Sequence, residues 1–102
     1  MTNIEQIMKN ELDRENIKYH QEYPLRSGFV IDFAIIDRKI AIECDGEKWH
    51  SSRKAQKKDR FRDWMLRRAG WVTLRFKGKE IENNIELCLR QIKEVLFSEI
   101  IR

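Results

Sequence analysis

Apolar and polar residues alternate through the middle of the chain, whereas toward both ends apolar residues recur at helical spacing. Residues 29–36 and 39–45 alternate on either side of positions 37–38, which predicts two strands joined by a two-residue turn. In this hairpin Ile36 faces Lys39, so the numbers of paired positions add up to 75. The other predicted elements are strands at residues 17–23 and 71–76 and helices at residues 4–12, 54–69 and 81–100.

Capping and turn residues mark the ends of several of these elements. Thr2 or Asn3 can cap the first helix, and Gly70 can end the second one. The third helix, 81–100, is predicted to be long and amphipathic, and its inward residues are Ile85, Cys88, Leu89, Ile92, Val95 and Leu96. The single proline, Pro24, is expected in a turn before the hairpin.

The element order α-β-β-β-α-β-α predicts an α/β fold. The strand–helix–strand step from residue 40 to residue 76 predicts a right-handed crossover between parallel strands. Because the preceding hairpin is antiparallel, we expect a mixed sheet of about four strands flanked by helices. At 102 residues, with 41% hydrophobic and 37% charged residues, the chain fits one folded domain over 1–102.

Three carboxylates gather on the predicted hairpin. Asp32 lies directly opposite Glu43, and Asp45 follows on the same face, beside the small residues Ala34 and Ala41. Like charges opposite each other destabilise a sheet, so we expect a compensating cation such as Mg²⁺. The alternative is an edge hairpin with solvated acids. The residues predicted on the other, apolar face are Ile31, Phe33, Ile35, Ile40, Ile42 and Cys44.

Positive charge is concentrated directly after this hairpin. Residues 53–79 contain eleven Lys or Arg and two Asp, a local charge of +9, in a chain whose net charge is +4. Such a block is typical of a surface that binds a polyanion, although a solvated basic helix is the alternative. Arg75 could clamp phosphate or pair with Asp59, and Trp49 could stack on a base or pack. The candidate phosphate contacts are Lys48, Lys54, Lys57, Lys58 and Arg62.

The remaining composition excludes several classes of protein. No apolar run approaches the roughly 20 residues of a membrane helix, and the N-terminus has no signal-peptide pattern. Cys44 and Cys88 provide no disulfide framework, and with two histidines they do not form a standard zinc motif. We therefore expect an intracellular, reducing location in the cytoplasm. Trp64 and Trp71 are predicted to lie in the core.

The motif that carries the most information is Asp32 followed by Asp45-Gly46-Glu47-Lys48-Trp49-His50, with Asp59, Arg62, Leu66, Gly70-Trp71 and Arg75-Phe76 after it. Over residues 4–90 this pattern resembles the PD-(D/E)XK nuclease superfamily. Its closest resemblance within the superfamily is to the very-short-patch-repair endonuclease branch, and it also resembles phage homing endonucleases with the EDxHD constellation. The resemblance implies a restriction-endonuclease-like fold. It also implies a metal-dependent DNA endonuclease or nickase, such as the catalytic domain of a homing endonuclease, using Mg²⁺ or Mn²⁺.

The resemblance also assigns roles to individual residues. Glu5 matches the glutamate of the first helix, Asp32 the metal-binding aspartate, and Cys44 the position whose main-chain carbonyl completes the metal shell. His50 matches the catalytic histidine, and Asp59 the aspartate that partners it.

Two positions depart from the repair enzymes. Asp45 stands where they have a histidine and where the wider superfamily has the ExK lysine. Glu43 matches the glutamate of the wider superfamily, although the repair enzymes have an apolar residue there. Their structural zinc ligands are also missing, so no structural zinc is expected.

These roles predict a mechanism of phosphodiester hydrolysis. The main metal ligand is Asp32, and further oxygens come from the Cys44 carbonyl and from either Glu43 or Asp45. His50 acts as general base on the attacking water. Asp59 orients His50, and Glu5 holds a metal-bound water. Each assignment has a structural alternative: His50 can be an ordinary loop histidine, and Asp59, Glu5 and Asp63 can be first-turn helix acids. Asp63 is assigned no chemistry.

Other functions remain open from the sequence. The same fold could serve as a non-catalytic DNA-binding module, an RNA nuclease or a basic protein–protein adaptor. Specific DNA recognition usually buries on the order of 1,000–2,500 Å², which is a large area for a chain of 102 residues. We therefore expect nonspecific DNA binding by the isolated chain, an attached DNA-recognition domain in a longer protein, or a homodimer.

Overall fold

The computed structural model describes residues 2–46 and 53–98. The strands form one sheet in the order β1-β2-β3-β4, in which β3 and β4 are parallel and the other two pairs are antiparallel. The predicted mixed α/β sheet is therefore confirmed. The elements are α1 (Asn3–Arg14), β1 (His20–Pro24), β2 (Val30–Ile35), the 3-10 helix η1 (Ile36–Arg38), β3 (Ile40–Asp45), α2 (Arg53–Arg68), β4 (Val72–Lys77), α3 (Gly78–Asn83) and α4 (Ile85–Leu96).

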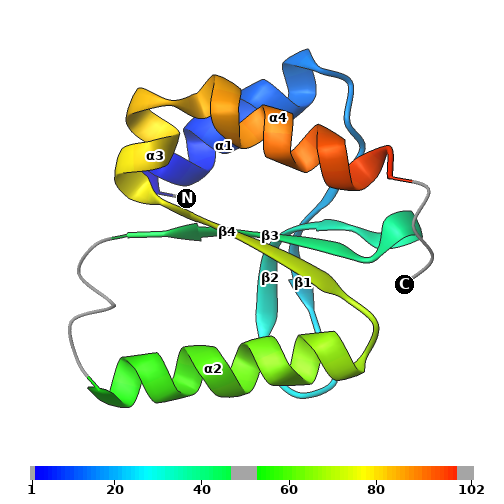
Figure 1. Ribbon diagram of the computed structural model, residues 1–102, viewed down its shortest axis with the longest axis vertical. Helices are drawn as coiled ribbons and strands as arrows, with labels where there is room; N and C mark the ends of the chain where they lie inside the picture. Colours follow the sequence, from blue (N-terminus) through cyan, green and yellow to red (C-terminus); the bar gives the residue numbers. More distant parts are fainter. Residues whose placement is uncertain (1, 47–52, 99–102) are drawn as a thin grey trace.

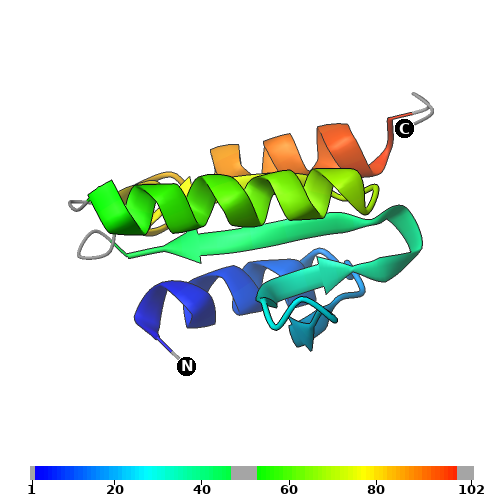
Figure 2. The same ribbon diagram turned by 90° about the horizontal axis from the view of Figure 1, so that it is seen from below.

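The helices form two unequal layers on the sheet. Helices α1, α3 and α4 cover one face, and α2 alone covers the other (Figure 1). Figure 2 views the molecule from the α2 side and shows this helix lying along the sheet. We call these two sides the three-helix face and the α2 face.

The three-helix face holds the larger apolar core. Thr2 caps α1 through a capping box, in which the Glu5 N–H donates to Thr2 Oγ1 (3.3 Å) and the Thr2 N–H donates to Glu5 Oε1 (3.0 Å). The helix then packs its apolar side against the sheet. The buried residues of this core are Met8, Leu12, Ile17, Phe33, Ile35, Ile40, Ile42, Phe76, Ile81, Cys88, Leu89 and Ile92.

The α2 face has a much smaller apolar cluster. Its buried residues are Ile31, Ala34, Ala41, Leu66 and Trp71. Trp71 is 8% exposed, which confirms its predicted core position. The same prediction is wrong for Trp64, which is 43% exposed, because α2 turns Leu66 rather than Trp64 toward the small cluster.

The hairpin has the predicted register but a different turn. Ile35 pairs with Ile40, Ala34 with Ala41, and Phe33 with Ile42, so paired numbers add up to 75 as expected. The connection is longer than predicted, because η1 and a left-handed Lys39 (φ 51°) replace a two-residue turn. The register is unchanged, because the longer turn takes in Ile36 from the first strand and Lys39 from the second.

The regular alternation of β2 side chains between the three-helix face and the α2 face is interrupted at Asp32. Phe33 packs in the core of the three-helix face and Ala34 in the cluster of the α2 face, as a regular strand requires. Ile31, however, lies with Ala34 on the α2 face, so its predicted place beside Phe33 is wrong. Glu22, on the neighbouring strand, has a left-handed backbone (φ 52°) at the level of this break.

Two boundaries also differ from the prediction. The helix predicted over 81–100 is divided into α3 and α4 at Asn84, whose backbone (φ −139°, ψ 47°) is not helical. Two consecutive asparagines, which favour turns over helix interiors, explain the interruption. Pro24, predicted in a turn, is the last residue of β1 and pairs with Val30 at the end of the ladder.

Neither cysteine forms a disulfide, and both Cys44 and Cys88 are free thiols. Across residues 2–46 and 53–98, none of the helices has the length and apolar character needed to span a membrane.

Candidate active site

The candidate site lies where β2 and β3 diverge. Regular pairing of these strands ends at Phe33 and Ile42, and beyond this point carboxylates bridge the two backbones. Glu43 Oε2 accepts a hydrogen bond from the Asp32 N–H (3.1 Å), and Asp32 Oδ2 accepts one from the Cys44 N–H (2.8 Å). The two acids that the register placed opposite each other therefore lie together, each anchored to the partner strand.

Burial makes this pair of carboxylates electrostatically costly. Glu43 is 1% exposed, and its burial, with the nearby Asp32 carboxylate, raises its pKa to about 8 even though Arg62 opposes the change. Burial also raises the pKa of Asp32. Two desolvated carboxylates side by side favour a proton or a cation between them.

Asp32 opens onto an acidic hollow at the N-terminal end of α1. The hollow has a volume of about 430 Å³, and its charged lining residues Glu5, Asp32 and Glu82 are all acidic. Glu82, from α3, was not among the predicted site residues, because nothing near it in the sequence indicates that α3 returns to this edge. The full lining is Thr2, Asn3, Ile4, Glu5, Asp32, Cys44, Gly46 and Glu82.

Glu43 and Asp45 lie on the α2 face, where they pair with arginines. The prediction that they share one face with Asp32 is met only in part, because Asp32 lines the hollow beside Glu5 of α1 while its carboxylate stays next to that of Glu43. Arg62 forms an ion pair with Glu43 and donates to the carbonyl oxygen of Val30. Arg62 was predicted as a surface phosphate contact, but the structure places it inside the α2 layer with a side chain that is 22% exposed.

The guanidinium of Arg75 contacts three carboxylates, which come from two elements, β3 and α2. Its guanidinium lies 3.2 Å from Asp45 on β3, and 2.5 Å and 3.8 Å from Asp63 and Asp59 on α2. Burial alone would lower the pKa of Arg75, but Asp45 and Asp63 outweigh burial and raise it. Of the two roles considered for Arg75, pairing with Asp59 is therefore present, and Asp45 and Asp63 lie closer still.

Asp63 was assigned no chemistry, yet it makes the shortest of these contacts. A signal for it was present in the sequence, because Asp59 and Asp63 are four residues apart and so lie on one face of α2. Both aspartates contact Arg75, which lies on β4. The local sequence around α2 does not predict this long-range contact.

The donor chemistry of the hollow fits a hard cation. Mg²⁺ and Mn²⁺ prefer oxygen ligands, and Asp32 and Glu5 present carboxylates here next to the backbone of Cys44. Burial, with neighbouring carboxylates, raises the pKa of the Cys44 thiol, so its sulfur does not offer a thiolate ligand. Within residues 2–46 and 53–98, no three His, Cys, Asp or Glu side chains lie close enough together to hold an ion by themselves.

Three predicted site residues, Lys48, Trp49 and His50, lie outside the described residues. Their assigned roles stay predictions. The other predicted phosphate contacts, Lys54, Lys57 and Lys58, are exposed on α2. Glu5 is a first-turn acid of α1, as its structural alternative proposed, and it also lines the hollow beside Asp32.

A solved structure has the same fold and defines the class of this protein. It is the homing endonuclease I-Bth0305I catalytic domain, with a TM-score of 0.77 and 27% sequence identity over 93% of this chain and 94% of that domain. The restriction-endonuclease-like fold expected from the sequence is confirmed. The chain is thus of a nuclease type.

The family can be stated as well. The family REase_MTES_1575 matches residues 4–96, and the chain belongs to it. The chain is 31% identical over 104 residues to an uncharacterized protein of Haemophilus influenzae, covering 99% of this chain and 83% of that protein. It is 32% identical over 81 residues to the uncharacterized protein YcjD of Escherichia coli, covering 79% of this chain and 66% of YcjD. The resemblance to the very-short-patch-repair branch stays a prediction.

Proposed function

We propose that this protein is a metal-dependent endonuclease that hydrolyses phosphodiester bonds in DNA. The observation that carries the proposal is the pairing of the half-buried Asp32 with the buried Glu43, where β2 and β3 separate. They lie beside an acidic hollow, in a fold shared with the catalytic domain of a homing endonuclease. A DNA substrate is proposed because that neighbour is named a homing endonuclease.

The metal site is proposed around Asp32. Asp32 would hold Mg²⁺ or Mn²⁺ together with the Cys44 carbonyl, and the adjacent Glu43 would add an oxygen. Asp45 would add one only by leaving its ion pair with Arg75. A bound cation would acidify a water and polarise the scissile phosphate. Glu5, which faces the same hollow, would hold a water by its carboxylate.

The chain's own residues position this machinery. The Cys44 N–H fixes the Asp32 carboxylate, and Arg62 holds Glu43 in the α2 layer. Arg75 ties Asp59 to β4 and β3, so the α2 carboxylate is kept at the edge where the strands end.

Proton transfer and substrate binding are assigned to the remaining residues. His50 would take the proton of the attacking water, and Asp59 would orient its imidazole and stabilise the charged form. The exposed lysines Lys54, Lys57 and Lys58 would contact phosphates along α2 without reading sequence.

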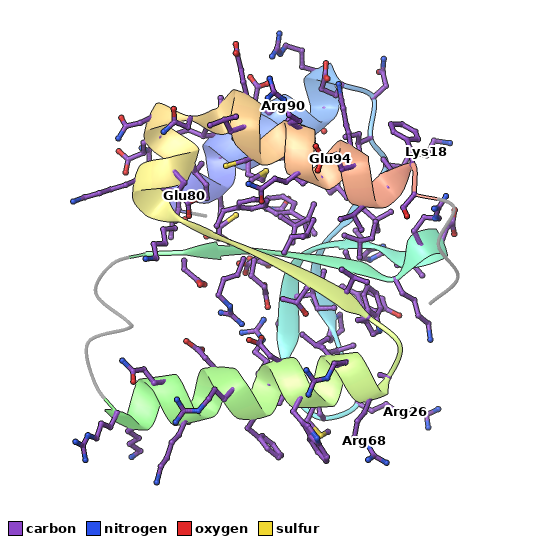
Figure 3. All side chains as sticks on the ribbon, in the orientation of Figure 1. Lys18, Arg26, Arg68, Glu80, Arg90 and Glu94 are labelled. Atoms are coloured by element: carbon purple, nitrogen blue, oxygen red, sulfur yellow. The ribbon has the colours of Figure 1, made fainter. Side chains whose placement is uncertain are left out.

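Plasmid cleavage with metal and with chelator tests the metal site. We expect Mg²⁺ or Mn²⁺ to support nicking or linearisation of supercoiled plasmid, and Asp32→Asn to lower the rate roughly 10²- to 10³-fold. Glu94→Gln is the matched control, because this carboxylate lies on α4 away from the hollow (Figure 3). Cleavage that persists in chelator, or in Asp32→Asn, would exclude the proposed site.

The assignment of the general base is tested by His50→Ala. We expect cleavage to slow by roughly 10²- to 10⁴-fold while DNA binding in chelator is retained, because a general base acts on the chemical step. Cleavage by this variant at the rate of the unsubstituted protein would show that another group takes the proton.

A further inference from the structure

A strip of aromatic side chains lies on the outside of α2 and plays no part in the core. We call Phe29, Phe61 and Trp64 the aromatic strip. Phe61 and Trp64 are 55% and 43% exposed, and their rings stack with centroids 6.0 Å apart and 23° between planes. Phe29, which precedes β2, meets Phe61 edge-on at 6.2 Å. The strip therefore presents ring surface to solvent from two elements.

The surroundings of the strip are strongly cationic. Helix α2 contains eight Lys or Arg and two Asp, and both aspartates pair with Arg75. The guanidinium of Arg68 lies 5.1 Å from the centre of the Trp64 ring, and the Arg68 side chain extends away from the sheet (Figure 3). An occupant of this surface should carry negative charge and also offer flat apolar faces.

A single nucleic-acid strand meets both requirements. Its phosphates match the cationic helix, and its bases have π-faces that stack on exposed aromatic rings. In an intact duplex those faces are covered by neighbouring base pairs, so the rings would find no free π-face to stack on. A second copy of this chain would place two cationic helices against each other, which charge repulsion disfavours.

The strip also adjoins the candidate site. Arg62 follows Phe61 in the helix, and its guanidinium lies 5.8 Å from the centre of the Phe29 ring. The same guanidinium forms the ion pair with Glu43. Arg62 therefore links the strip to the side of α2 that packs on Glu43.

We propose that the aromatic strip binds an unpaired base, so that the preferred substrate has a single-stranded segment. This inference rests on the proposed function for the identity of the polyanion as DNA. It goes further by naming the form of DNA and the side chains that select it. Phe61 and Trp64 supply the stacking surface, and the surrounding Lys and Arg hold the phosphates.

Binding without cleavage tests the strip. Fluorescence anisotropy in chelator would compare a labelled single strand, the corresponding duplex and an abasic strand of equal length. We expect the unsubstituted protein to bind the single strand more tightly than either of the others. Phe61→Ala and Trp64→Ala should each weaken single-strand binding by roughly 5- to 100-fold and leave abasic-strand binding unchanged, because only the stacked base is lost.

Two control variants separate stacking from general damage to the surface. Trp64→Tyr keeps an aromatic ring and should retain most of the affinity. Leu87→Ala removes a side chain that is 48% exposed on α4, and it should change nothing. Circular dichroism would verify that each variant is folded.

The outcomes that overturn the inference are distinct. Equal affinity for the normal and abasic strands, or no binding to any strand, would remove the stacking role. A dimer in light scattering that Trp64→Ala converts to a monomer would assign the strip to a contact between copies. Ring-dependent binding without any cleavage would refute the nuclease proposal alone, and Asp32-dependent cleavage with ring-independent binding would refute the strip alone.

Discussion

The two faces of the sheet are covered by different chemistry. On the three-helix face, buried apolar side chains such as Phe33 and Ile42 pack beneath α1, α3 and α4. On the α2 face the apolar cluster is small, and arginines from α2 and β4 pair with carboxylates instead. The difference teaches that one layer supplies most of the fold's stability, while the other positions charged groups.

Strand β3 shows how one segment serves both faces. Ile40 and Ile42 face the apolar core, whereas Ala41 and Glu43 face α2. The small Ala41 leaves room for the long side chains of α2 to reach the sheet. Substitutions on the two faces should therefore have different effects, and the following experiments test this separation.

The largest loss of stability is expected from Phe33→Ala. Phe33 is fully buried and packs edge-on against Tyr19 at 5.3 Å, so its removal leaves a cavity in the main core. We expect a loss of about 3–5 kcal/mol in the free energy of unfolding by urea. The matched control, Phe61→Ala on the α2 surface, should cost less than about 0.5 kcal/mol. Equal losses would show that the faces do not differ in this way.

A smaller loss is expected from Arg75→Met. This change leaves Asp45, Asp59 and Asp63 near one another without their shared cation, which should cost about 2–3 kcal/mol at neutral pH. The loss should shrink as the pH falls, because protonation removes the repulsion. Lys9→Met, which breaks the exposed Lys9–Asp13 pair, is the control and should change stability little. A loss that does not vary with pH would mean that Arg75 acts mainly by packing.

The smallest effect is a dependence of stability on pH that comes from Glu43. Its pKa of about 8 in the folded protein lies above its ordinary value of 4.5, so the folded state binds the extra proton between these values. The free energy of unfolding should therefore fall as the pH rises from about 5 to about 8. Denaturant unfolding in chelator across this range would measure the fall.

Glu43→Gln supplies the control for this pH dependence. The amide cannot ionise, so the slope between pH 5 and pH 8 should flatten. An equally steep slope in the variant would assign the effect to other groups, of which Asp32, with its own raised pKa, is the first to examine.

Much of the fold was predictable because its determinants are local or periodic. Alternation of Ile and Ala around residues 33–42 specified the strand pairing, and this pairing did not depend on the kind of turn. The break in the face of β2 was not predictable. It coincides with a left-handed backbone at Glu22, a non-glycine residue that carries no turn signal in the sequence.

The sequence predicted which carboxylates lie together in the candidate site better than it predicted their ion pairs. Asp32 and Glu43 were placed together by register, and the structure joins them through backbone hydrogen bonds. The acids that pair with Arg62 and Arg75 lie on other elements of the fold, Glu43 on β3 and Asp63 on α2. Arginines in a basic block usually contact phosphate, so the sequence did not predict these internal ion pairs.

The guanidinium of Arg75 has a consequence for how this sequence can diverge. It neutralises carboxylates at positions 45, 59 and 63, which come from two separate segments of the chain. A relative that lost the arginine alone would keep three crowded acids without the guanidinium that they share. Natural variation at these four sites should therefore be correlated, so that a neutral residue at position 75 accompanies the loss of one or more of the acids.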